Sequence, residues 1–253
     1  MELKERILQV MDKKRHSSVE FFHRQILLDG QRATLEQYKM YCRQEFEVFV
    51  RDFPSYLDAI VEKNPPEDMK RELTANAHEE RHGKIEGITS HVEMYLHTMM
   101  KLGFSRDDFK DVELLPESRA YKQWIRDIIR HGSALEASVV VNIFVEGSYK
   151  DRQELDPSKP PVDVKEVLEN HPLVLHFGLK PQDLPLKRRH LVVEDGHRQS
   201  AHGFSRHADT EAKQRDIVEV LRLTLSMWNH YRNGVAAAYS VPGYHRLREY
   251  VKA

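Results

Sequence analysis

Apolar residues recur along most of the chain at the intervals of an α-helix. Between positions 37 and 64, one helical face would carry Tyr38, Tyr41, Phe46, Val48, Phe49, Tyr56, Leu57 and Ile60. Glycine and proline are sparse, with 11 of each, so residues that favour helices fill nearly every segment. We therefore predict an all-α fold.

Capping residues and prolines predict where the first of these helices begin and end. Thr34 and Gln37 have the spacing of a capping box, which predicts a helix that begins directly after Thr34. Pro54 should kink or restart this helix, and the sequence Asn64-Pro65-Pro66 should end it. A further helix is expected from Glu67 through Gly83.

The remaining segments predict more helices and one connector. Ser90 begins a second capping box before 91–102, and Gly103 is placed to stop that helix. Helices are expected over 116–132 and 133–150, the second being the most apolar part of the chain, and over 186–207 and 210–239. Most of the prolines lie in 151–185, which we interpret as a connector with one short helix. We expect residues 1–253 to form one domain, because the last two helices alone would bury too small a core.

Composition narrows the functional classes. The net charge of -1 creates no general field for nucleic acid or for an anionic membrane. The charged N-terminal segment and the absence of a long apolar run predict a cytoplasmic protein without a membrane span. Cys42 is the only cysteine, which excludes an intramolecular disulfide framework and a cysteine zinc site. The 15 histidines, by contrast, make metal binding worth examining.

The first candidate site is the motif H-x3-E-x2-H formed by His190, Glu194 and His197. On a helix this spacing places three side chains along one face. Two imidazoles and a carboxylate suit iron, manganese or zinc, and the lack of thiolates argues against a structural zinc. The alternative is a solvated face, since charged residues surround the motif.

Glu146 is the second candidate, because it follows the apolar run 139–145. A buried carboxylate must be paired, protonated or bound to a cation. The alternative is that the helix already ends at Gly147 and Glu146 is exposed there.

The segment 76–97 offers two carboxylate and imidazole pairs. Glu80 and His91 are eleven positions apart, and a loop between two helices would have to bring them together. Glu79 and His82 form E-x2-H, the adjacent-turn pair of di-iron carboxylate bundles. With either pair, the three clusters supply oxygen and nitrogen ligands for two metals in a helical bundle.

With these motifs in this order, the sequence resembles the haem-oxygenase-like di-metal oxidases and oxygenases, a family of iron-containing redox enzymes related to the thiaminase II and pyrroloquinoline-quinone synthase folds. The resemblance covers most of the chain, from FVRDFPSYLDAIVEKN through NAHEERHG, HVEMYLHTMMKLG, FVEG and HLVVEDGH to SMWNHYRNGVAAAY. It implies metal ligation by Glu80, His91, Glu146, His190, Glu194 and His197. Some members use E-x2-H, so Glu79 with His82 stays open as the first pair. Glu194 stands where many members have Asp, a difference that bears on occupancy of the second metal.

The resemblance also implies a fold and an activity. The fold would be a seven-helix bundle of the haem-oxygenase type without haem. The cofactor would be two Fe(II) ions, or an iron and manganese pair, with dioxygen as cosubstrate. The substrate would be a small molecule, amino-acid-like or fatty-acid-like, that undergoes N-oxygenation, desaturation or carbon–carbon cleavage in a biosynthetic pathway. An external electron donor and a homodimer are further expectations.

Two other readings compete with this one. A metal-free oxidase of the pyrroloquinoline-quinone synthase type would share the fold, but it has no need of Glu146 together with the H-x3-E-x2-H face. A thiaminase is disfavoured because Cys42 lies in an early helix, away from the position of that nucleophile. A non-catalytic helical interaction module would place the histidines on solvated surfaces and bind no metal.

Overall fold

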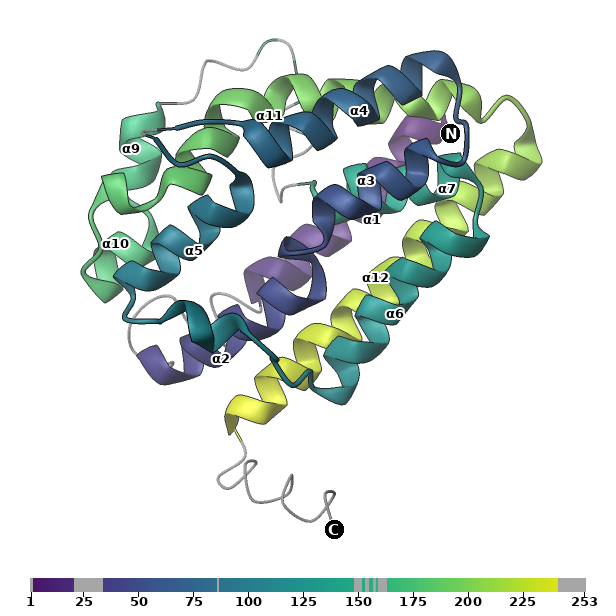
Figure 1. Ribbon diagram of the computed structural model, residues 1–253. Helices are drawn as coiled ribbons and strands as arrows, with labels where there is room; N and C mark the ends of the chain where they lie inside the picture. The colour runs from purple at the N-terminus through teal and green to yellow at the C-terminus, as the bar shows by residue number, and fades with distance from the viewer. Residues whose placement is uncertain are drawn as a thin grey trace.

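Helices form almost all of the described chain in the computed structural model (Figure 1). The structure describes residues 2–20, 34–85, 87–147, 152, 155–156, 158 and 163–240, without the side chains of 19–20, 193–200 and 239–240. Within these ranges the one pairing of extended backbone is an isolated bridge between Ile85 and Ile88. The predicted all-α class is confirmed.

The helical elements of the described residues run in chain order from α1 to α12. In the first half of the chain they are α1 (Leu3–Glu20), α2 (Leu35–Glu45), the π-helix η2 (Phe46–Val50), α3 (Phe53–Val61), α4 (Glu67–His82), α5 (His91–Lys101), η3 (Arg106–Phe109) and α6 (Pro116–His131). The second half contains α7 (Ala134–Ser138), the π-helix η4 (Val139–Val145), α9 (Val164–Glu169), α10 (Pro172–Phe177), η5 (Pro181–Asp183), α11 (Pro185–Gly203), η6 (Phe204–His207) and α12 (Glu211–Ser240).

The long helices pack as a bundle (Figure 1). The helix α12 lies along α6 and also contacts α1, η4 and α7. The helix α3 packs on α4, and α11 contacts α4, α5 and η4. The ends of α4, α5 and η4 therefore meet beside α11, far apart as they are in the sequence.

The predicted boundaries agree with the local chemistry. Thr34 and Gln37 form the expected capping box at the start of α2, and the Ser90 side chain accepts from the Glu93 amide at the start of α5. Pro54 lies in the first turn of α3, where its missing N–H costs nothing. Gly103 follows the end of α5 with φ of 84°, a conformation that glycine adopts without strain.

The structure differs from the sequence analysis in two segments. The apolar helix expected over 133–150 is α-helical only to Ser138 and continues as the π-helix η4, which ends before Glu146. Residues 148–150 of that prediction lie outside the described part of the structure. The described part of the proline-rich connector contains two short α-helices, α9 and α10, so the expectation of one was wrong. Pro172 cannot continue α9, but it fits the first turn of a new helix, for which His171 is the N-cap.

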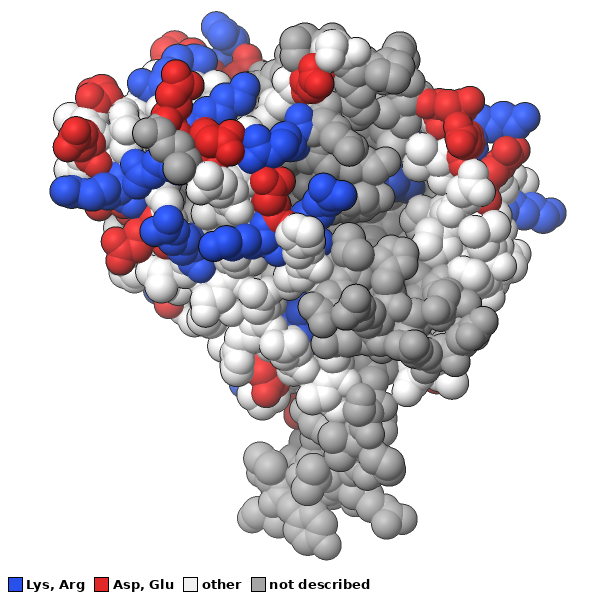
Figure 2. Space-filling view, turned by 180° about the vertical axis from the view of Figure 1, so that it is seen from behind, with Lys and Arg blue, Asp and Glu red and all other residues white. Residues whose placement is uncertain are grey.

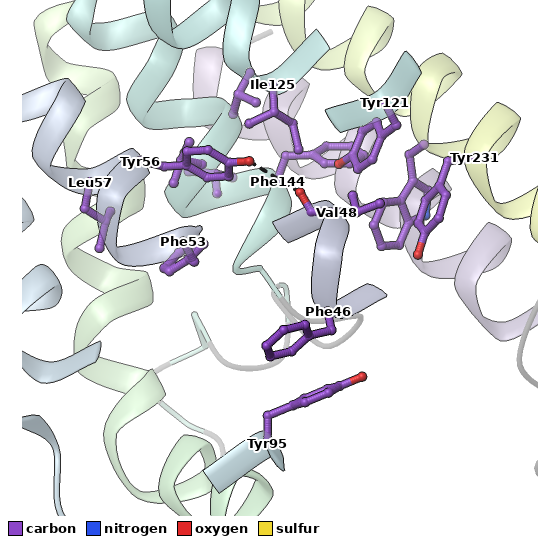
Figure 3. Close-up of a cluster of buried hydrophobic side chains, with 14 of the residues drawn as sticks. Phe46, Val48, Phe53, Tyr56, Leu57, Tyr95, Tyr121, Ile125, Phe144 and Tyr231 are labelled. Carbon is purple, nitrogen blue, oxygen red and sulfur yellow. Dashed lines mark hydrogen bonds between the residues drawn. The ribbon is translucent and has the colours of Figure 1, made fainter. Parts of the chain in front are cut away.

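Aromatic side chains fill the centre of the bundle (Figure 3). Tyr121 stacks on Tyr231 with ring centroids 5.5 Å apart, and Tyr56 donates a hydrogen bond to the Val48 carbonyl oxygen at 3.3 Å. On the face shown in Figure 2, acidic and basic side chains are interspersed over the described surface. No helix among the described residues is long and apolar enough to cross a bilayer.

Candidate metal centre

A reversal of the chain between α4 and α5 brings Glu80 and His91 together. The helix α4 ends at Gly83, where a side chain would overlap that of Glu79. Ile85 and Ile88 then exchange two backbone hydrogen bonds of 3.2 and 2.9 Å, and the turn uses Gly87 with φ of 84°. Because α5 begins at His91, this turn returns the imidazole to the last turns of α4.

Three potential metal ligands converge at this point. His91 Nδ1 lies 2.7 Å from Glu80 Oε1, and the rings of His91 and His190 have centroids 5.1 Å apart with an interplanar angle of 60°. One ligand atom from each of the three residues lies within 4.8 Å of the others. The trio comes from three helices, α4, α5 and α11.

The chemistry of the trio fits a bound cation. His91 is 5 % exposed, yet neither of its ring nitrogens makes a hydrogen bond of acceptable geometry within the described structure. Two ligands that bind one ion at about 2.1 Å and at right angles are about 3 Å apart, close to the separation of Glu80 and His91. A metal ion would supply the partner that the imidazole lacks.

The trio opens onto a cavity of about 120 Å³. The cavity is lined by Phe49, Val50, Phe53, Glu80, His91, Val145, Glu146, Leu186 and His190. This lining contains two carboxyl groups and no lysine or arginine, so a cation in the cavity would balance its charge. Both π-helices contribute to it, η2 through Phe49 and Val50 and η4 through Val145, and π-helical turns occur often at functional sites.

Glu146 faces this cavity from the end of η4, although it is not one of the three closest ligands. Its Oε2 accepts a hydrogen bond of 3.0 Å from Asn76 Nδ2, and the same amide donates to Asn142 Oδ1 at 3.2 Å. Asn142 in turn donates to the Ser138 carbonyl oxygen at 3.2 Å. The carboxylate is thus held toward the cavity by a buried amide pair.

The members of the alternative pair, Glu79 and His82, contact different partners. His82 is exposed, and its ring lies against His78 with centroids 4.7 Å apart. Glu79 forms an ion pair of 2.5 Å with Arg189, and its Oε1 lies 3.6 Å from His91 Nε2. Of the two pairings considered, the structure brings together Glu80 and His91.

The H-x3-E-x2-H motif lies on α11. His190 lines the cavity, whereas the side chains of Glu194 and His197 lie outside the described part of the structure. The backbone of α11 is helical without interruption from Pro185 to Gly203. The motif therefore has the continuous helix that its spacing requires.

Cys42 is buried in α2, and burial raises the pKa of its thiol well above the ordinary value. A thiol with a raised pKa forms little thiolate at neutral pH. Cys42 therefore has the environment of a packed core residue and not that of a nucleophile.

Sequence reasoning missed the residues that shape the site without belonging to a metal motif. The amide of Asn76 stands four positions before Glu80 on a buried face of α4, a placement that could have indicated its role. The ion pair of Arg189 with Glu79 joins α11 to α4 beside His91, and nothing in the sequence indicated which acid Arg189 would contact.

Comparison with known proteins agrees with this arrangement. The fold is similar to that of a TenA homolog from Pseudomonas syringae pv. tomato str. DC3000, with a TM-score of 0.65, 12 % identity, and coverage of 93 % of this chain and 95 % of that one. At this identity the likeness shows the haem-oxygenase-like fold alone. Comparison with curated protein sequences gives no match. Residues 40–229 match the model of a family described as iron-containing redox enzymes, so this chain belongs to that family.

Proposed function

We propose that this protein is a non-haem di-iron enzyme that uses dioxygen to oxidise a small molecule. The observation that carries the proposal is the convergence of Glu80, His91 and His190 in a cavity that Glu146 also lines, in a chain of an iron-containing redox family. Carboxylate and imidazole ligands from several helices of a bundle are the set used by di-iron carboxylate proteins.

In this proposal each part of the site has a defined task. The ligands are Glu80, His91, Glu146, His190, Glu194 and His197, the last two being included on the spacing of their motif. Bound iron would supply the capacity to reduce dioxygen and oxidise the substrate. Asn76 holds the carboxylate of Glu146, and Arg189 holds that of Glu79 beside His91.

The cavity wall indicates what part of the substrate reaches the site. Five apolar side chains surround the four potential ligands: Phe49, Val50, Phe53, Val145 and Leu186. Such a wall excludes water and receives an uncharged hydrocarbon group more readily than an ammonium or carboxylate group. We therefore expect the reacting carbon atoms to lie in an aliphatic portion of a fatty-acid-like or amino-acid-like molecule.

Anaerobic reconstitution with Fe(II) tests this function. We expect about two iron equivalents per chain and a visible absorption that develops when dioxygen is admitted. His190→Ala and Glu146→Ala should each lower the bound iron. Binding of less than one equivalent by the unaltered protein, with no change in either variant, would overturn the proposal and favour a metal-free oxidase or an interaction module.

A substrate screen follows from the same experiment. Fatty acids and amino acids of increasing aliphatic length are added before dioxygen, and the decay of the absorption is followed. Compounds of the substrate class should accelerate the decay of the absorption, and mass spectrometry should detect their oxidised product. If only short polar compounds accelerate it, the expectation of an aliphatic reacting group is wrong.

A further inference from the structure

The first helix carries a lysine at a position where its pattern calls for an apolar residue. The buried stripe of α1 contains Ile7, Val10, Met11, Lys14 and Ser18. Lys14 is only 5 % exposed, and a buried ammonium is costly unless hydrogen bonds compensate for the lost water. Its contacts should therefore reveal why a charge is retained in the core.

Those contacts are at the end of the π-helix that carries the site. Lys14 Nζ donates to the Gly147 carbonyl oxygen at 2.8 Å and also to the Phe144 carbonyl oxygen. The ammonium lies 4.9 Å from the ring centroid of Phe144 and 5.2 Å from that of Trp228. Carbonyl groups at a helix C-terminus lack helical donors, and a cation there is favourable.

The two carbonyl groups flank Glu146 in the sequence. Lys14 therefore fixes the backbone on both sides of Glu146, while Asn76 fixes its carboxylate. A π-helix has fewer favourable contacts per residue than an α-helix and is usually short. An external donor at its end would therefore help to keep Glu146 directed at the cavity.

We propose that Lys14 is a positioning residue that holds Glu146 in the metal site, an inference that rests on the proposed function. It extends the site to α1, which lies before residues 40–229, where the family model matches. The hydrogen bonds from Lys14 to the Phe144 and Gly147 carbonyl oxygens act on the backbone on both sides of Glu146.

The test compares Lys14→Met with Lys13→Met, a control at an exposed position of the same helix. Anaerobic Co(II) titration measures affinity, because the visible spectrum of Co(II) reports its ligands independently of turnover. We expect Lys14→Met to weaken Co(II) binding about tenfold or more, the usual effect of replacing a residue that supports a metal ligand. Lys13→Met should bind Co(II) as the unaltered protein does. Lys14→Arg, which keeps the charge and the donors, should restore part of the affinity.

Two further measurements separate positioning from mere stability. Methionine suits a core position, so thermal unfolding of metal-free Lys14→Met should be unchanged or shifted upward while its affinity falls. In a Glu146→Gln background, Lys14→Met should have little additional effect, because both changes act on one ligand. If Lys14→Met is too poorly folded to titrate, Lys14→Gln replaces it in the same comparison.

The outcomes distinguish a failure of this inference from a failure of the proposed function. Unaltered protein that binds no Co(II) or Fe(II) refutes the metal site, and the role of Lys14 with it. Normal binding by the unaltered protein and by Lys14→Met, or losses that add fully to those of Glu146→Gln, refutes the role of Lys14 alone.

Discussion

His91 Nδ1 lies 2.7 Å from Glu80 Oε1, although the two residues belong to different helices and are separated by a reversal of the chain. The ring nitrogens of this buried imidazole make no hydrogen bond of acceptable geometry within the described structure. The pair therefore has the geometry expected of two ligands of one ion, and this geometry distinguishes His91 from His82.

Replacement of His91 should remove metal, whereas replacement of His82 should not. His91→Asn deletes a member of the trio, and His82→Asn changes an exposed side chain on the adjoining helix. We expect His91→Asn to bind at most half of the iron that the unaltered protein binds in anaerobic reconstitution, measured by elemental analysis. Equal losses in both variants would instead restore Glu79 with His82 as the first ligand pair.

Asn76→Leu should weaken metal binding without preventing folding. The change removes the amide that donates to Glu146 at 3.0 Å and to Asn142 at 3.2 Å, while the branching at Cγ and the number of side-chain heavy atoms are kept. We expect a loss of affinity of about tenfold in Co(II) titration. The control is Asn170→Leu, since Asn170 is exposed and donates only locally, to the Glu166 carbonyl oxygen at 2.9 Å. An unchanged affinity in Asn76→Leu would mean that Glu146 needs no such support.

Those parts of the fold that depend on local chemistry could be predicted from the sequence. Helix caps and stops depend on neighbouring backbone groups, so a short stretch of sequence is enough to predict them. Thr34, Ser90 and Gly103 are examples. The π-helical course of 139–145 could not be predicted in this way. A π-helical turn is wider than an α-helical turn. Whether the segment adopts it depends on how the other helices pack around it.

The candidate site, too, could be predicted only in part from the sequence. The motifs and the family resemblance together identified Glu80, His91, Glu146 and His190 as residues that could share a site, with Glu79 and His82 left open as the first pair. The structure places the first four around one cavity. The supporting contacts join residues far apart in sequence, such as Lys14 with Gly147 across 133 positions. No periodicity encodes such a pairing, because it arises from how α1 is packed against the bundle.

Arg232→Met should destabilise the fold through its partner Glu45. Arg232 is buried, lies 3.9 Å from Glu45 Oε1, and stacks over Trp228 at 4.1 Å from the ring centroid. Burial raises the pKa of Glu45, and the guanidinium opposes that rise. Without Arg232 the carboxyl group is left without its cation, and we expect a loss of about 3 kcal/mol in the free energy of unfolding.

Urea unfolding of metal-free protein at pH 7 measures this loss. Glu45→Gln combined with Arg232→Met should recover part of it, because the double variant no longer buries an uncompensated acid. Equal stability of the single and double variants would show that the lost stacking on Trp228, and not the charge of Glu45, causes the effect.

His171 should make the stability of the protein depend on pH between about 4 and 6.5. Burial, with a smaller contribution from Lys187, lowers the pKa of its imidazole from 6.5 to about 4. As the pH falls, the unfolded chain therefore takes up the proton before the folded protein does. The stability that depends on neutral His171 is complete above pH 6.5 and decreases toward pH 4, by about 2 kcal/mol between pH 7.5 and pH 5.

His171→Asn isolates this contribution. In the folded protein His171 Nδ1 accepts the Leu173 amide at 3.2 Å as the N-cap of α10, and an Asn side chain can accept the same amide without titrating. We expect the two metal-free proteins to unfold at similar urea concentrations at pH 7.5 and the variant to be the more stable at pH 5. Parallel loss of stability in both proteins would assign the acid sensitivity to other groups, because the remaining histidines are common to the two.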